Sequence, residues 1–227
     1  YIMRLYKQPL SSGEANVRKD IHKLFDIVKL LRDPIDGCPW DLDQTFSSIA
    51  PHTIEEAYEV ADAIENNDIM GLKDELGDLL FQIVFLAEIA VEKDLFSFDD
   101  VVNTICDKMV RRHPHIFGDL KIQTADAVSL SWENIKATER ADKQRLAPDT
   151  QDQSALSGVA IALPALIRAQ KLQKRASREG FDWSGVDQVF EKIFEEILEV
   201  KAEIRDSGDS SRLEDEVGDL LFCCVNL

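Results

Sequence analysis

The hydrophobic residues of this 227-residue chain recur at intervals of three and four over most of its length, which is the spacing of amphipathic helices. Residues 17–32 place their apolar side chains on one stripe, and the pattern stops before Pro34. After a stretch of turn-forming residues, Thr53 stands three positions before Glu56 and predicts the capped start of a second helix, which reaches about Asn66. Since neither strand alternation nor hairpin signals appear, the pattern predicts an all-α protein.

The third predicted helix, residues 69–93, is the most apolar part of the chain. From Leu79 onward it is apolar on almost every side, which is typical of a central buried helix. Ser97 then caps a fourth helix that ends at the sequence RRHPH. Four helices joined by short connections predict one bundle, which we assign to a first domain of residues 17–118.

The apolar density falls over residues 119–158, which we interpret as a linker that carries one exposed helix in the sequence SWENIKATERADKQR. A new helical set begins near Leu163, in the sequence PALIRAQKLQKRAS. Two further helices follow it, over residues 186–205 and from Ser211 onward. We therefore expect a second domain over residues 159–227.

The second half of the chain repeats the first. The sequence IEEAYEVADAI at Ile54 aligns with FEEILEVKAEI at Phe194, and LKDELGDLLF at Leu72 aligns with LEDEVGDLLF at Leu213. The loops ahead of these helices share a glycine and a tryptophan (Gly37 and Trp40; Gly180 and Trp183). The predicted fold class is therefore all-α, with two tandem copies of one acidic helical bundle.

The repeated helices carry paired carboxylates. Glu56 and Glu59 lie three positions apart on one helix face, and Glu75 and Asp78 do the same on the next helix. If the two helices pack antiparallel, the four carboxylates converge, which is unfavourable without a counter-charge. Oxygen ligands of high negative charge suit a hard divalent cation, Mg2+ or Mn2+. Such a cation keeps several water ligands, whose positions substrate phosphates can take.

A purely structural interpretation competes with the metal site. Acidic pairs at helical spacing are often a solvated face, and near a helix N-terminus they also complement the macrodipole. Gly77 argues against this interpretation. A glycine inside a helix lowers helix stability by about 1 kcal/mol relative to alanine, and we expect it where another group must approach the backbone closely. The second copy repeats both acidic pairs and the glycine, so we interpret its acids as metal ligands too: Glu196, Glu199, Glu216 and Asp219.

Composition narrows the classes of partner. The chain has 43 acidic and 26 basic residues, and its net charge of -17 argues against nucleic-acid binding. The longest apolar run is too short to cross a bilayer, and the first residues lack a secretory signal. Four cysteines without CxxC or zinc spacing suit a reducing compartment. We expect a cytoplasmic protein that binds neither nucleic acid nor membrane.

Several long motifs resemble the MazG family of nucleoside triphosphate pyrophosphohydrolases. In the first half these are RDPIDGCPWDLDQT, IAPHTIEEAYEV, ELGDLLFQ and KMVRRHPHIFGD, with Glu-x-x-Glu and Glu-x-x-Asp in the family's order. In the second half, RAQKLQKRASREGFDW and the second acidic set resemble the family's C-terminal domain. The resemblance covers the chain from about Ile21 to Leu227.

The resemblance implies an all-α homodimer that uses Mg2+ to hydrolyse nucleoside triphosphates to the monophosphate and pyrophosphate, in nucleotide pool clean-up or regulation. It assigns the family's metal positions, which are also the catalytic residues of the first domain, to Glu56, Glu59, Glu75 and Asp78. It assigns the corresponding positions of the second domain to Glu196, Glu199, Glu216 and Asp219. Which carboxylate serves as a base stays open.

The resemblance also implies cationic contacts to the triphosphate. Lys108, Arg111 and Arg112 end the fourth helix, where complementing the helix dipole is the alternative role. In the second domain, Lys192 and Arg212 each stand four residues before a predicted metal ligand.

Three further side chains near these positions have plainer interpretations. His113 and His115 flank a proline, and we interpret them as structural. Trp40 either stacks on a base or packs with its loop, and we favour packing.

The chain stops at Leu227, where the family's C-terminal domain continues with another helix that carries basic residues. The second bundle is therefore expected to be truncated at its C-terminus, and which of the two domains is active stays open. Two other classes of protein compete with the enzyme. A di-iron bundle expects Glu-x-x-His, and none of the four histidines stands three after a glutamate. A non-catalytic acidic helical dimer, acting as a regulator or interaction scaffold with degenerate metal sites, is the more serious alternative.

Overall fold

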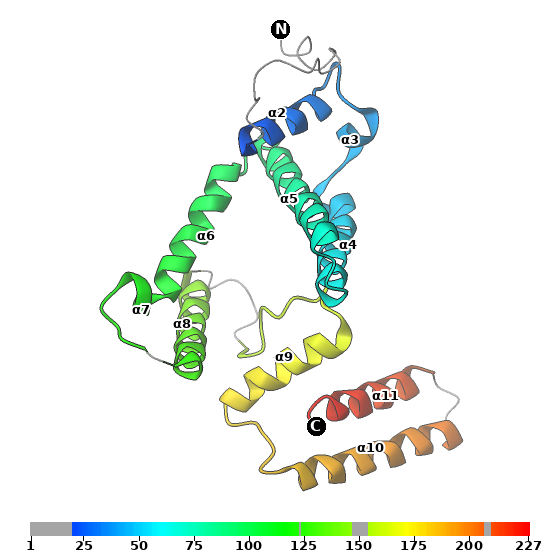
Figure 1. Cartoon of the computed structure of the whole chain (residues 1–227). Helices are drawn as coiled ribbons and strands as arrows, with labels where there is room; N and C mark the ends of the chain where they lie inside the picture. The colour runs from blue at the N-terminus through cyan, green and yellow to red at the C-terminus, as the bar shows by residue number, and fades with distance from the viewer. Residues whose placement is uncertain (1–19, 123, 147–153, 207–209) are drawn as a thin grey trace. The chain divides into compact units, whose positions relative to one another are not determined.

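The computed structural model describes residues 20–122, 124–146, 154–206 and 210–227, and within these ranges it is helical and has no strand (Figure 1). The helices are α2 (Ile21–Leu31), α3 (Pro39–Asp43), α4 (Phe46–Glu65), α5 (Ile69–Glu92), α6 (Phe98–Arg112), α7 (Pro114–Phe117), α8 (Ala125–Leu146), α9 (Ala165–Arg178), α10 (Val186–Asp206) and α11 (Ser210–Cys224). The all-α prediction is confirmed. The predicted start of the first helix, residues 17–19, lies outside the described residues.

The chain divides into two compact units, one ending at Trp132 and the other running from Glu133 to Leu227, and each is described by itself. The division falls inside α8, so the helix predicted within the linker is present and contributes to both units. Residues 147–153 of the predicted linker lie outside the described residues. The predicted domain boundaries at 118 and 159 therefore stay predictions.

Helix α4 begins seven residues before the start that the sequence predicted at Thr53, and that prediction is wrong. Its true cap is a reciprocal pair: the backbone N–H of Ser48 donates to the Thr45 hydroxyl at 3.2 Å, and that of Thr45 donates to the Ser48 hydroxyl at 2.8 Å. Pro51 lies inside the helix and forfeits one backbone hydrogen bond. Thr53 instead donates its hydroxyl back to the carbonyl of Ile49 at 3.3 Å, so it caps nothing.

Helices α5 and α6 begin and end close to their predicted bounds. The Asp68 carboxylate accepts from the N–H of Gly71 at 2.9 Å and caps α5. Ser97 and Asp100 cap α6 reciprocally, with the N–H of Ser97 donating to the Asp100 carboxylate at 2.8 Å. These hydrogen bonds from Ser97 hold the pKa of Asp100 below its ordinary value.

The core of the first unit lies where α2, α4 and α5 meet. Its fully or nearly fully buried residues are Val28, Ile49, Val84, Phe85 and Ile89. Helix α4 packs along α5, and α2 crosses the C-terminal part of α5 (Figure 1). This packing fixes the α4–α5 pair, which carries the first set of predicted metal ligands.

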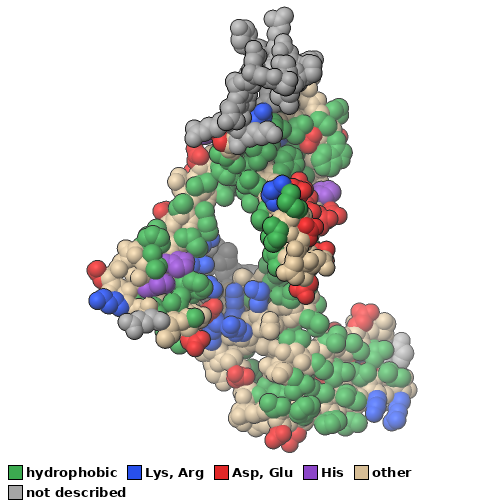
Figure 2. All heavy atoms as spheres, viewed as in Figure 1, with side chains coloured by type: hydrophobic (Ala, Val, Ile, Leu, Met, Phe, Trp, Pro, Cys, Tyr) green, Lys and Arg blue, Asp and Glu red, His purple; other side chains and the backbone are tan. Residues whose placement is uncertain are grey.

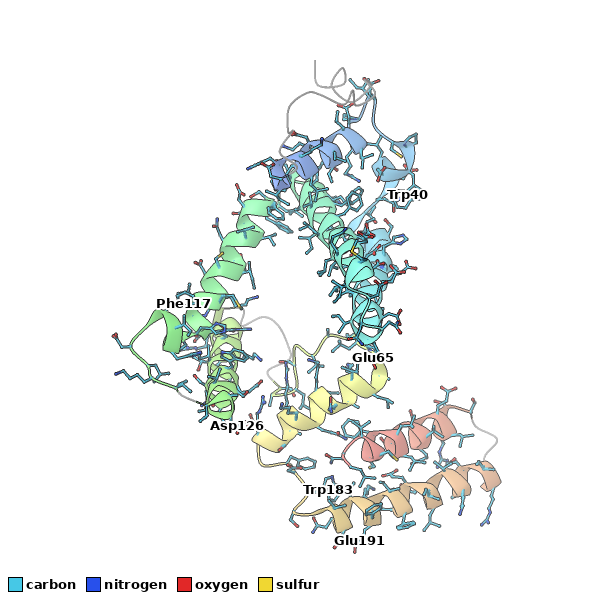
Figure 3. All side chains as sticks on the ribbon, viewed as in Figure 1. Trp40, Glu65, Phe117, Asp126, Trp183 and Glu191 are labelled. Atoms are coloured by element: carbon cyan, nitrogen blue, oxygen red, sulfur yellow. The ribbon has the colours of Figure 1, made fainter. Side chains whose placement is uncertain are left out.

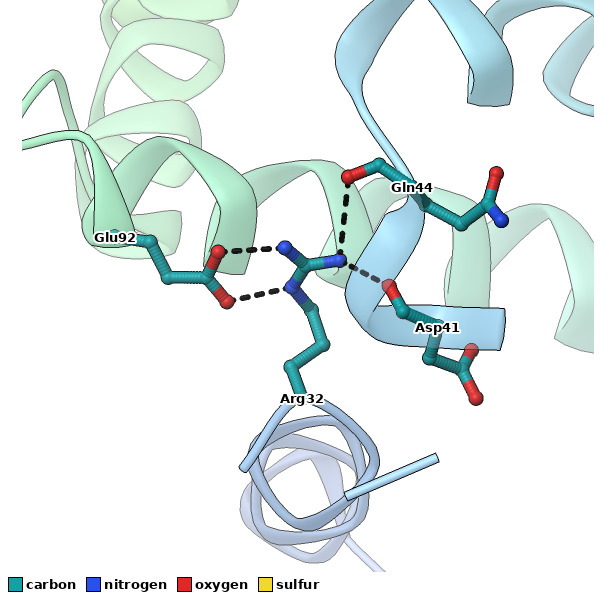
Figure 4. A network of polar contacts seen from close by, with 4 residues as sticks. All are labelled: Arg32, Asp41, Gln44 and Glu92. Carbon is teal, nitrogen blue, oxygen red and sulfur yellow. Dashed lines mark hydrogen bonds and ion pairs between the residues drawn. The ribbon is translucent and has the colours of Figure 1, made fainter. Parts of the chain in front are cut away.

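Arg32 connects helix α3 to the end of α5 (Figure 4). Its guanidinium makes two hydrogen bonds to the Glu92 carboxylate, at 2.5 and 2.6 Å, and donates to the backbone carbonyl of Asp41 at 2.5 Å. The same group lies 5.1 Å from the centre of the Phe85 ring. Because Arg32 is only 8% exposed, these contacts replace its water shell.

Helix α6 meets α5 near its own start and then diverges from it, so the four helices of the first unit do not close into a compact bundle within one chain (Figure 1). The divergence leaves apolar side chains of both helices exposed, among them Leu76, Leu80, Ile83, Ile105 and Met109. From Val84 to Ala90 helix α5 is buried on nearly all sides, as its apolar sequence predicted, whereas Leu76, Leu80 and Ile83 earlier in the helix are exposed.

In the second unit, α10 packs along α11, and α9 contacts α11. A broad apolar surface covers the visible face of α10 and α11 (Figure 2). Its exposed side chains include Phe190, Phe194, Leu198, Leu221 and Phe222. Trp183 lies in the loop before α10, whereas Trp40 lies in the short helix α3 ahead of α4, so the two segments differ in local structure (Figure 3).

Among the described helices, none has both the length and the apolar character that a bilayer span requires.

Candidate metal centres

Three carboxylates of the first unit gather between α4 and α5. Glu56 of α4 and Glu75 and Asp78 of α5 each offer one oxygen, and these oxygens lie within 4.8 Å of one another. The short turn between the helices makes this possible, because it reverses the chain and sets the two Glu-x-x-Glu/Asp faces opposite each other. Asn67 supports that turn with a left-handed backbone, at φ 54°. The predicted convergence of the two helices is therefore present.

Glu59 is the fourth predicted member of this cluster. It offers no oxygen to the three-carboxylate group, but it interacts with both Glu56 and Glu75. Burial raises the pKa of Glu56, and the charges of Asp78 and Glu59 raise it further. Burial and the charges of Glu59 and Asp78 likewise raise the pKa of Glu75. The site is therefore short of positive charge.

Gln82 belongs to this site, although the sequence reasoning did not include it. It lies one turn after Asp78, is 7% exposed, and its hydrogen bond to Glu56 partly offsets the rise of that group's pKa. Its amide oxygen is buried without a hydrogen-bond partner among the described residues. The signal in the sequence was a polar residue interrupting an apolar helix, one turn after a predicted ligand.

The second unit repeats the arrangement. Glu196 of α10 and Glu216 and Asp219 of α11 bring one oxygen each within 4.8 Å of one another. Glu199 lies beside them, and burial, followed by the charges of Glu196 and Glu216, raises its pKa. The two units thus present the same carboxylate geometry at corresponding positions.

The donor set fits a hard divalent cation. Glu196 is 3% exposed, and its Oε2 is buried without a hydrogen-bond partner among the described residues. A buried carboxylate oxygen without a donor is costly, and the two other carboxylates of the cluster cannot donate a hydrogen bond when ionised. A cation of the Mg2+ or Mn2+ type, which takes oxygen ligands, would satisfy all three groups at once.

A lysine distinguishes the second cluster from the first. The Lys192 ammonium donates to Glu196 at 2.8 Å and to Glu195 at 2.9 Å, and these contacts hold its pKa well above the ordinary value. The corresponding residue of the first unit is His52, which lies 3.5 Å from Glu55. The second cluster therefore carries a built-in counter-charge that the first cluster lacks.

Arg212, the other cation predicted in the second unit, pairs at 2.5 Å with Glu203, which is not one of the three clustered carboxylates. Lys108, Arg111 and Arg112 lie at the end of α6 that diverges from α4 and α5 (Figure 1). Their role in substrate binding stays a prediction.

The aromatic residues near these segments have packing contacts. His113 has its Nδ1 2.7 Å from the carbonyl of Met109, and its ring meets Trp132 edge to face with centroids 5.1 Å apart. The His115 ring packs against that of His113, with centroids 5.6 Å apart. Trp40 meets His52 edge to face at 6.1 Å between centroids (Figure 3). These contacts agree with structural roles.

Several known proteins are similar in sequence to this chain. The family model of the MazG nucleotide pyrophosphohydrolase domain matches residues 44–117, which include the whole first cluster. A nucleoside triphosphate pyrophosphohydrolase of Escherichia coli (strain K12) is 50% identical over 208 residues, covering 91% of this chain and 76% of that protein. A nucleoside triphosphate pyrophosphohydrolase/pyrophosphatase MazG of Thermotoga maritima is 43% identical, covering 90% of this chain and 74% of that protein.

A crystal structure of a mazG-related protein from Thermotoga maritima is also similar, with a TM-score of 0.43 and 23% identity, covering 51% of this chain and 98% of that one. The identity to the two long relatives extends well beyond the first cluster and takes in most of both units. By this similarity and by its matched domain, the chain belongs to the MazG nucleotide pyrophosphohydrolase family.

Proposed function

We propose that the protein hydrolyses nucleoside triphosphates to the monophosphate and pyrophosphate, with Mg2+ held by its carboxylate clusters. The observation that carries the proposal is the gathering of three carboxylate oxygens within 4.8 Å in each unit, with a buried, donor-less oxygen in the second. The relatives from Escherichia coli and Thermotoga maritima are nucleoside triphosphate pyrophosphohydrolases by name, which supports the substrate class.

A bound divalent cation would neutralise the triphosphate and lower the pKa of a coordinated water. The residues of this chain hold the site for it. Glu56, Glu75 and Asp78 present their oxygens from two packed helices, so the geometry rests on rigid elements rather than on loops. Glu59 interacts with Glu56 and Glu75 and would be a candidate to accept a proton from the attacking water.

The cationic residues are assigned to the triphosphate. Lys192 already lies at the second cluster, where its ammonium would donate to a phosphate oxygen of the substrate if Glu196 held a cation. For Lys108, Arg111 and Arg112, we propose that assembly brings the end of α6 toward a cluster. Exposed apolar side chains on α5 and α6, such as Leu80 and Ile105, support a homodimer that buries them.

We place the enzyme in the cytoplasm, in the control of nucleotide pools. All four cysteines are free, although Cys223 and Cys224 are neighbours in α11, which agrees with a reducing compartment. The net charge of -17 disfavours nucleic acid as a partner.

The alternative is a non-catalytic acidic scaffold that uses the same apolar faces. Incubation of the protein with a mixed panel of nucleoside triphosphates and Mg2+, with pyrophosphate and monophosphate measured separately, distinguishes the two. The proposal requires both products in equal amounts and none after the metal is removed. Release of inorganic phosphate with the diphosphate, or no release at all, contradicts it.

A further inference from the structure

A cavity of the second unit, separate from its carboxylate cluster, is lined by basic side chains. Its volume is about 460 Å3, and it lies between the start of the unit on α8, the turn before α9, and α9 itself. The basic lining residues are Lys136, Lys171, Lys174, Arg175 and Arg178, and Glu133 is the single acidic residue that lines it. None of the carboxylates of the metal centre is among the lining residues.

This concentration of positive charge is unusual for the chain. Acidic residues outnumber basic ones by 43 to 26, yet the segment from Arg168 to Arg178 has five basic residues and no acidic one. One side of α9 carries four of them, where like charges one turn apart repel each other: Lys171, Lys174, Arg175 and Arg178. The dipole of α9 stabilises the charges of Arg175 and Arg178 in its last turn. It does not explain Lys171 in the middle of the helix or Lys136 on another helix.

Two of the five basic residues build the walls of the cavity. Arg175 donates to the backbone carbonyls of Leu156 and Ser157 and so holds the turn before α9 in place. Gly158, at φ +76°, gives that turn its left-handed residue. Arg178 pairs with Glu133 at 2.7 Å and joins α9 to α8. The cavity is therefore held by specific contacts.

Other basic groups remain available to a ligand. Among the described residues, neither Lys171 nor Lys174 has a carboxylate partner. Lys136 shares Glu133 with Arg178, at 3.2 Å, so one carboxylate serves two cations. The lining thus holds a net positive charge, which favours an anionic occupant.

We propose that this cavity binds an anion that carries two or more linked phosphate groups. The size of the cavity is that of a small-molecule site and exceeds the needs of a single phosphate. Its cations come from two helices, α8 and α9, so that a linked phosphate chain can contact both. Val159 and Leu163 add an apolar part that suits a nucleoside attached to the phosphates.

The site works without a divalent cation, because its charge is carried by lysine and arginine, and this separates it from the proposed metal centres. The test uses the whole chain, stripped of metal and then dialysed free of chelator, since a chelator is itself an anion. Without metal the carboxylate clusters repel phosphates, so binding measured by calorimetry reports the basic cavity. We expect inorganic pyrophosphate to bind once per chain, and inorganic phosphate to bind at least about tenfold more weakly.

Variants of the lining residues test whether pyrophosphate binds in this cavity. Lys171→Gln with Lys174→Gln should weaken pyrophosphate binding about tenfold or more, whereas Lys171→Arg with Lys174→Arg should retain it. The matched control, Lys121→Gln with Lys201→Gln, removes the same charge from exposed positions and should leave the affinity unchanged. Equal melting temperatures establish that the variants are folded.

A comparison of adenosine triphosphate with inorganic tripolyphosphate tests the apolar part, which predicts tighter binding of the nucleotide. Absence of binding without metal, equal binding by the glutamine variant, or an equal loss in the control overturns the proposal. Pyrophosphate release in the presence of Mg2+ is measured separately, so the test of the proposed hydrolysis does not depend on the outcome of the binding test.

Discussion

Lys192 lies one helical turn before Glu196 and donates to its nearly buried carboxylate at 2.8 Å, while the other oxygen of that carboxylate has no hydrogen-bond partner among the described residues. One side of Glu196 is thus neutralised by the protein and the other is left to a ligand. The first unit has His52 at the corresponding position. The two candidate metal centres therefore have equivalent carboxylates and differ in their counter-charge.

This relationship predicts the effect of Lys192→Gln. Without the ammonium, Glu196 and Glu195 lose their cation, so the metal-free protein should melt several degrees lower than the wild type. Mg2+ should then raise the melting temperature of the variant more than that of the wild type, because the metal no longer competes with lysine. Calorimetric melts with and without Mg2+ measure both effects. Lys201→Gln on the same helix is the control. An equal rise of the melting temperature with Mg2+ in Lys192→Gln and in the wild type would contradict the proposal that Lys192 and the metal compete for Glu196.

Millimolar Mg2+ is predicted to stabilise the wild-type fold, because it relieves repulsion among the clustered carboxylates of the first unit, which have no cationic partner among the residues that the structure describes. The effect should depend on pH. Glu56, Glu75 and Glu199 have pKa values raised above the ordinary 4.5, so the folded protein binds protons more tightly there than the unfolded chain does. Their contribution to stability is full below the ordinary pKa and is lost as the pH rises through the raised values.

The stabilisation by Mg2+ should therefore be largest near neutral pH and shrink as protons occupy the same oxygens at acidic pH. Melting curves of a metal-stripped sample, with and without Mg2+ at about pH 7.5 and about pH 5, provide the comparison. Glu56→Gln should weaken both the Mg2+ response and its dependence on pH. A melting temperature that Mg2+ leaves unchanged at neutral pH would rule out the site.

Much of the fold could be predicted from the sequence because it depends on local patterns. The caps of α6 and the bounds of α5 follow from Ser97 and from apolar periodicity within the helix itself. The start of α4 was misplaced because Thr53 and Glu56 imitate a capping box, whereas the true cap at Thr45 precedes a proline that the helix tolerates.

The candidate sites could be predicted to the extent that spacing along a helix determines which side chains share a face. The spacing of Glu75 and Asp78, and its repetition in the second half, was enough to predict the convergence. Spacing along a helix does not predict contacts between residues on different helices. Arg32 and Glu92 are 60 positions apart, and Arg212 pairs with Glu203 rather than with a carboxylate of the cluster. The divergence of α6 from α5 likewise depends on packing that no local pattern records.

The Arg32 network predicts a large effect of a conservative change. Arg32→Lys keeps the charge but cannot make two hydrogen bonds to Glu92 and still reach the carbonyl of Asp41, so the variant should lose about 2–3 kcal/mol of the free energy of unfolding. Lys29→Gln, on the exposed side of the same helix, should change it by less than about 0.5 kcal/mol. Urea unfolding curves measure both. A loss in Arg32→Lys no greater than in the control would show that the network contributes little.

The exposed apolar side chains of α5 predict that the protein is a homodimer or a larger even assembly. Leu80→Lys places a charge on this face and should shift the mass found by light scattering at micromolar concentration toward the monomer. Ile35 is 89% exposed in a loop, so Ile35→Lys should leave the mass unchanged. A wild-type protein that is monomeric at this concentration would refute the assembly.

The most direct test of the carboxylate clusters as catalytic metal centres is pyrophosphate release from nucleoside triphosphates by the wild type, Asp78→Asn, Asp219→Asn and the double variant. Each substitution keeps the size of the side chain and removes a ligand charge, so the fold should survive. We predict that Asp78→Asn lowers the rate by a factor of about 100 or more, on the scale of a main electrostatic contributor. Loss in Asp219→Asn alone would transfer the activity to the second unit, whereas full activity in the double variant would contradict the metal centres altogether.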